Sequence, residues 1–212
     1  QRDPRALMEP RPELFAFDGI EVYNGDDASR LGEVESVMED WFALLRAGKR
    51  TVATGNSDSP RLPFHEPGLP GTVIAAPDGD LGSLDQGEPV SSLRAGKAMV
   101  SGGPFIALSI DGVGPGGEVP PGERQVRVTV DAPPWMDVAE AEILIDGRSA
   151  LRTSQVAAGV RRIDLSAPLA LAPGSFVIAV TRGRRAMEDV LYRSRIFPFS
   201  FTNPVFVRAT TP

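Results

Sequence analysis

The residues best suited to chemistry lie in a loop that follows a predicted strand at 51–54. This loop carries Asn56-Ser57-Asp58-Ser59 and then His65, the single histidine of the chain. A serine, an aspartate and a histidine are the members of a nucleophilic triad, but the sequence offers neither a nucleophile elbow nor an oxyanion loop. A loop after a parallel strand is where α/β proteins place functional groups. We therefore treat this loop as the candidate functional site.

Two further polar residues, Glu21 and Asn24, close an earlier predicted strand at 20–23. An amphipathic pattern predicts a helix over 28–47, and strand, helix and strand in succession indicate a parallel pair. The carboxyl ends of parallel strands meet at one edge of a sheet. An Asn-Gly turn explains Asn24 equally well. We predict one site mouth, lined by Glu21, Asn24, Asn56 and Ser59.

Composition excludes several classes of function. The chain has 212 residues, no cysteine and a formal net charge of −6. The absence of cysteine excludes disulfides, thiolate metal sites and a cysteine nucleophile. The acidic balance argues against a nucleic-acid partner, and no apolar run approaches the roughly 20 residues of a membrane helix. We therefore expect neither nucleic acid nor a membrane as partner.

The pattern of the sequence changes near residue 103. Before it, the α/β character continues with a strand at 72–76, a short helix at 90–96 and a strand at 98–101. After it, short strands alternate with turns at intervals typical of an antiparallel sandwich. These strands are predicted at 105–110, 126–130, 141–145, 160–165, 176–181 and 199–207. The predicted fold class is therefore α/β plus all-β, with an α/β unit over 1–103 and an Ig-like β-sandwich domain over 104–212.

Several phrases of the sequence resemble one enzyme family. They are FDGIEVYNG at 17–25, WFALLRAGKR at 41–50 with ATGNSDS at 53–59, LRAGKAMVSGGPF at 93–105, APPW at 132–135 and FSFTNPVFV at 199–207. Together they resemble the C-terminal part of PHP-type (polymerase and histidinol phosphatase) metallohydrolases of the CehA/McbA type.

The resemblance implies a fold, a cofactor and a partner. Residues 1–103 would form the C-terminal part of a distorted β/α barrel. The family's cofactor is a divalent metal, zinc, manganese or iron, which activates a water that hydrolyses small-molecule phosphate or carbamate esters. The family's early histidine ligands have no counterpart in this chain. The implied partner is therefore the missing N-terminal barrel portion or another chain.

The matching loop departs from the family pattern at two positions. Asp58 occupies the family's aspartate position, but Pro60 stands where a histidine ligand is expected. The family's Gly-x-Pro-Arg-Thr phrase is here Gly68-Leu69-Pro70-Gly71-Thr72, which lacks the arginine that suits an anionic substrate. Asp58 and His65 are the candidate metal ligands; the alternatives are a turn-capping aspartate and a surface histidine.

Two functions of different classes remain open. One is a fragment of a PHP-like metal-dependent phosphoesterase, inactive as this chain unless other residues supply the histidines. The other is a non-catalytic binding or surface-presentation module with a degenerate site. Pro60 and Gly71, the two departures from the family pattern, favour this second function.

Overall fold

Strands dominate the structure, a computed structural model that describes residues 15–25, 31–59, 66–76, 85, 87–191 and 196–210. The first half contains β1 (Gly19–Asn24), α2 (Leu31–Arg46), β2 (Val52–Asn56), β3 (Gly71–Ile74), α3 (Gly87–Arg94) and β4 (Ala98–Gly102). The second half contains β5 (Phe105–Ile110), β6 (Glu118–Val119), β7 (Gly122–Asp131), β8 (Glu140–Ile145), β9 (Arg148–Thr153), β10 (Arg161–Leu171), β11 (Phe176–Arg182), β12 (Phe199–Thr202) and β13 (Val205–Val207). Neither described helix has the length and apolar character needed to cross a membrane.

The largest sheet has eight strands and includes both halves of the chain. β11 lies at its centre, with β12 and β13 along one side and β8, followed by β9, along the other. β4 pairs with β12, β3 pairs with β4, and β6 pairs with β13. Two strands from before the predicted boundary at 103/104 thus share one hydrogen-bonded sheet with six strands from after it.

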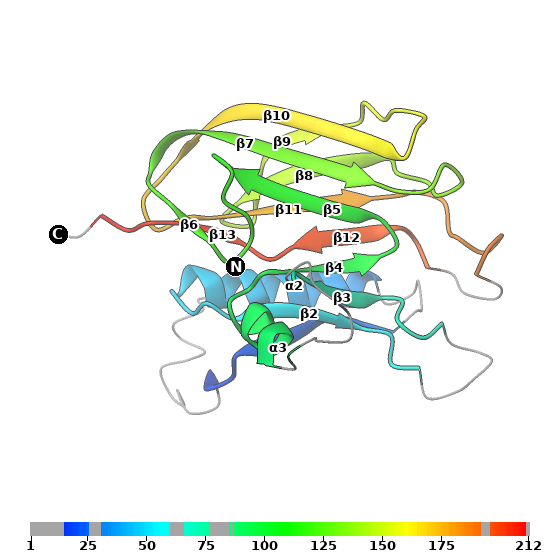
Figure 1. Cartoon of the computed structure of the whole chain (residues 1–212), viewed down its shortest axis with the longest axis horizontal. Coiled ribbons are helices and arrows are strands. Elements are labelled where there is room, and N and C mark those ends of the chain that lie inside the picture. Colours follow the sequence, from blue (N-terminus) through cyan, green and yellow to red (C-terminus); the bar gives the residue numbers. More distant parts are fainter. Residues whose placement is uncertain are drawn as a thin grey trace.

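The side chains of this sheet alternate between two cores. On β11, Val177 and Ala179 contribute to the first core, whereas Phe176, Ile178 and Val180 contribute to the second. The first core lies against a three-stranded antiparallel sheet in the order β10-β7-β5. The second lies against α2 and the β1-β2 pair. Figure 1 shows the resulting layers, with β7 and β10 above the large sheet and α2 and β2 toward its lower side.

The predicted α/β plus all-β fold class, with the C-terminal part of a β/α barrel over 1–103, is wrong. Strands make up 44% of the structure and helices 14%, and none of the three sheets in the described part of the chain is closed. Among the described strands before residue 103, β1 and β2 are the one parallel pair. β3 instead runs antiparallel to β4, and β4 runs antiparallel to β12, so the chain turns from the α/β unit into an open sheet.

Candidate functional site

The β1-α2-β2 unit determines where the candidate residues lie. Its two strands are parallel, and their register places Asn24 beside Asn56 at their carboxyl ends. α2 connects them because its apolar side chains recur on one face, which is buried in the second core. The buried set on this face is Val34, Met38, Trp41, Phe42 and Leu45. Trp41 also fixes the start of β2, since its indole N–H donates to the Thr51 carbonyl at 2.8 Å.

Three of the predicted mouth residues come together around one carboxylate. Asn56 Nδ2 donates to Glu21 Oε1 at 2.6 Å, and Asn24 Nδ2 donates to Glu21 Oε2 at 3.1 Å. Each carboxylate oxygen of Glu21 therefore accepts one side-chain amide, and the three residues lock the two strand ends together.

Asp58 lies just beyond the end of β2, on the loop that the sequence singled out. It is exposed, and its φ of 44° is in the left-handed region that aspartate tolerates. The loop is held beside it by the Ser57 hydroxyl, which accepts a hydrogen bond from the Gly68 N–H at 3.0 Å. Ser59 Oγ is buried without a hydrogen-bond partner among the described residues. The other candidate ligand, His65, and the neighbouring Pro60 lie outside the described residues.

A hollow of about 540 Å³ opens at this end of β2. Asn56, Ser57 and Asp58 line one side of it, and Gly68 and Thr72 line the other. Among the described residues that line it, Asp58 is the one acidic residue. Glu21 lies outside the lining, and its carboxylate accepts from the amides of Asn24 and Asn56. The hollow is of a size that small molecules occupy.

The described residues do not fit the divalent-metal site that the family resemblance implies. Among them, no group of three or more histidine or carboxylate side chains converges on a point where a metal could sit. Asp58 is the one carboxylate among the described residues that line the hollow, and the carboxylate of Glu21, on the adjoining strand, is engaged by Asn24 and Asn56. A hydrolytic zinc site commonly uses three protein ligands, and a hard cation wants six or more oxygens.

β2 is attached to the large sheet by side chains, a feature that the sequence did not reveal. On the side facing away from β1, the Ala53 N–H donates to Asn203 Oδ1 at 2.8 Å, and Asn203 Nδ2 donates to the Ala53 carbonyl at 3.0 Å. Gly55 lies two residues further along β2 and is bound by Thr72 of β3. The Thr72 hydroxyl accepts from the Gly55 N–H and donates to the Gly55 carbonyl, both at 2.9 Å. Asn203 and Thr72 thus replace the neighbouring strand that this edge lacks.

A glycine permits the close approach that these bonds require. A Cβ atom on Gly55 would lie 2.4 Å from Val100 Cγ1 on β4, nearer than non-bonded carbon atoms approach. The signals for this attachment in the sequence are Gly55 and the Asn203-Pro204 pair after β12. Both lie within phrases of the family resemblance.

Comparison with known proteins gives no relative: no family model, no curated protein and no solved structure matches this chain. The likeness to PHP-type metallohydrolases therefore stays a prediction that rests on the quoted phrases.

Proposed function

We propose that this chain is a non-catalytic binding module that carries a degenerate PHP-type site. The observation that carries the proposal is the amide clamp on Glu21, in which Asn24 and Asn56 each donate to one carboxylate oxygen. The strand ends where a metallohydrolase would gather its ligands are instead joined by hydrogen bonds from two side-chain amides to one carboxylate. The hollow beside them has the size and lining of a binding site, with one carboxylate, Asp58, at its margin.

The chemistry of ester hydrolysis supports this assignment. A metal-dependent hydrolase must hold its cation with several ligands and leave an open position for the attacking water. Asp58 alone offers too few donors. Turning Glu21 toward a cation at the hollow would require breaking its hydrogen bonds of 2.6 and 3.1 Å to Asn56 and Asn24, and it would still supply only a second carboxylate beside Asp58.

The proposal is tested by assaying the purified 212-residue chain against phosphomonoester, phosphodiester and carbamate substrates, with manganese or zinc added. We expect no turnover above that of the Asp58→Ala variant, and far less than one equivalent of divalent metal by elemental analysis. Asp111→Ala serves as the matched control, because Asp111 is also an exposed loop aspartate with positive φ, remote in sequence from the hollow. Turnover that Asp58→Ala abolishes and Asp111→Ala preserves contradicts the proposal.

The second candidate is a PHP-like hydrolase fragment whose histidines come from another chain or another segment. The observation in its favour is the placement of Asn56 and Asp58 at the carboxyl ends of parallel strands joined by a helix, facing one hollow. Its test is the Pro60→His variant, which restores the family's Asp-x-His phrase. Stoichiometric zinc or manganese binding by this variant, lost again on adding Asp58→Ala, would favour a hydrolase ancestry.

A further inference from the structure

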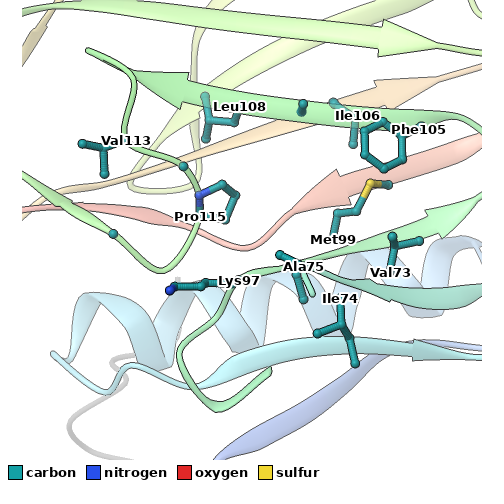
Figure 2. A pocket seen from close by; sticks show the side chains of 14 residues that line it. Val73, Ile74, Ala75, Lys97, Met99, Phe105, Ile106, Leu108, Val113 and Pro115 are labelled. Carbon is teal, nitrogen blue, oxygen red and sulfur yellow. The ribbon is translucent and has the colours of Figure 1, made fainter. Parts of the chain in front are cut away.

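A second hollow, of about 610 Å³, opens between the two facing sheets. β3 and β4 of the large sheet form one wall, and β5 of the three-stranded sheet forms the other. The loop at 113–117 closes one end (Figure 2). All residues that line it belong to the described part of the chain, and the volume falls in the range of small-molecule sites.

The walls of this hollow are apolar almost throughout. Met99, Ile106 and Leu108 are buried residues of the first core whose side chains also border the hollow. Phe105 and Val73, at the end away from the loop, are 48% and 41% exposed, which makes them two of the few large hydrophobic side chains on the described surface. Apolar surface of this kind, concentrated around a cavity, marks a ligand site more often than chance exposure does.

One charged group borders the hollow, at the opposite end from Phe105. Lys97 precedes β4 and is the single charged residue of the lining; in Figure 2 its amine lies at one end, below Pro115. Its backbone is fixed, because the Ala75 N–H donates to the Lys97 carbonyl at 2.9 Å. Lys97 takes part in none of the ion pairs between described residues, whereas the only other lysine, Lys49, packs over the Phe17 ring at 4.6 Å.

We propose that this hollow binds an amphipathic anion, a molecule with one carboxylate head and an unbranched apolar tail. The head would pair with Lys97, and the tail would run between β4 and β5 toward Phe105 and Val73. This proposal rests on the proposed function only in taking the chain to be a binding module, and it adds a second site, separate from the hollow beside Asp58. It follows from the charge pattern, because a cation at one end of an otherwise apolar cavity complements a molecule that is charged at one end only.

The first experiment measures binding to the intact chain by isothermal titration calorimetry, with octanoate, 1-octanol and acetate as probes. We expect octanoate to bind, 1-octanol to bind roughly two- to fivefold more weakly because it lacks the charge, and acetate to show no binding. Shortening octanoate to hexanoate removes two buried methylenes, each equivalent to about a fourfold loss, and should weaken binding about 15-fold.

Two pairs of variants locate the ligand. Lys97→Gln should reduce octanoate binding to the level of 1-octanol, and Lys49→Gln, the matched control, should leave it unchanged. Ala75→Phe places a ring in the hollow and should abolish binding of both probes. Ala76→Phe adds the same ring at the next exposed position, outside the lining, and should have no effect.

The two lysines also provide an internal footprint. Limited acetylation followed by mass spectrometry should show Lys97 protected by octanoate and Lys49 unchanged in the same sample.

Absence of octanoate binding overturns the proposal, as does equal affinity for octanoate and 1-octanol without protection of Lys97, which would indicate a purely apolar ligand. Dimerisation that Ala75→Phe abolishes would likewise assign the hollow to a second copy of the chain. Each of these results leaves the hydrolase assay unaffected, so the failure of this proposal is distinct from the failure of the proposed function.

Discussion

Replacing Asn203 by alanine tests how β2 is held against the large sheet. Asn203 is fully buried, and its amide group joins the N–H and the carbonyl of Ala53, which is also fully buried. Its third side-chain bond goes to the Ala98 carbonyl at 3.2 Å, but that carbonyl also accepts from the Asn203 backbone N–H at 3.1 Å and keeps a partner in the variant. The substitution therefore leaves two buried backbone groups unpaired.

The expected loss follows from that count. Each buried polar group left without a partner costs about 1–3 kcal/mol, so Asn203→Ala should lower the free energy of unfolding by about 4 kcal/mol. This is a large share of the roughly 5–15 kcal/mol that stabilises a typical domain. In a urea titration with an m-value of about 2 kcal/mol/M, the midpoint should fall by about 2 M. Fluorescence of the buried Trp41, on the helix that packs beside β2, provides the signal.

Two further variants sharpen this test. Asn56→Ala removes an exposed amide with one hydrogen bond to Glu21 and should cost no more than about 1 kcal/mol. Asn203→Asp keeps an acceptor for the Ala53 N–H but turns a carboxylate oxygen toward two carbonyls, so at pH 7 it should be at least as destabilising as alanine. An Asn203→Ala midpoint within about 0.5 M of the parent, with an unchanged m-value, would refute the reasoning.

Two other substitutions carry definite expectations. Gly55→Ala should destabilise the chain by about 2 kcal/mol or more in urea unfolding, because its Cβ would lie 2.4 Å from Val100 Cγ1. Gly159→Ala is the control: a Cβ there would have no atom within 4 Å, so stability should change by less than about 0.5 kcal/mol. Glu142 is buried, and its carboxylate accepts from Arg152 Nη2 at 2.9 Å. Burial acts to raise the pKa of Glu142. Hydrogen bonds from Ser149 and Arg152, together with the charges of Arg152 and Arg182, outweigh burial and hold this pKa below its usual value. A lowered folded-state pKa means that this carboxylate stabilises the fold fully above about pH 4.3 and progressively less as the pH falls through the folded value. Glu142→Gln should therefore cost about 1–3 kcal/mol at pH 7, with a difference from the parent that shrinks toward pH 2; a difference independent of pH would contradict the assigned pKa direction.

Local elements were predictable where periodicity was strong. The helix predicted over 28–47 corresponds to α2, because its apolar residues recur at three- and four-residue spacing and one face is buried. The strands at 105–110 and 176–181 correspond to β5 and β11, which contain the β-branched residues typical of buried strands. The strand β9 was not predicted, since its sequence, RSALRT, has too little apolar alternation to reveal it.

The arrangement of the sheets was not predictable from these local patterns. The short apolar strand β4 reads the same whether its neighbour is parallel or antiparallel, and its actual neighbour, β12, lies about a hundred residues further along the chain. The segment predicted as one strand over 199–207 is divided by Asn203 and Pro204 into β12 and β13. Asn203 keeps one backbone bond to β4, since its N–H donates to the Ala98 carbonyl at 3.1 Å, while its side chain binds Ala53 of β2.

The candidate site was predictable only in its local part. Parallel strand ends bring Glu21, Asn24 and Asn56 together, as the strand-helix-strand pattern indicates. The bonds from Thr72 and Asn203 to β2 depend on tertiary packing across 17 and 150 residues, and no spacing in the sequence encodes them. The engagement of Glu21 by two amides was likewise visible only in three dimensions.

The attachment of β2 connects the tail of the chain to the candidate site. Asn56 and Asp58 project from a strand whose outer edge is held by one asparagine and one threonine side chain rather than by a continuous ladder. A ladder tolerates most side-chain substitutions because its bonds are made by the backbone, whereas this edge depends on two particular residue types. A substitution at Asn203 should therefore move the strand end that carries Asn56 and Asp58, although Asn203 does not line their hollow. Binding at that hollow and stability of the β1-β2 pair should consequently decline together.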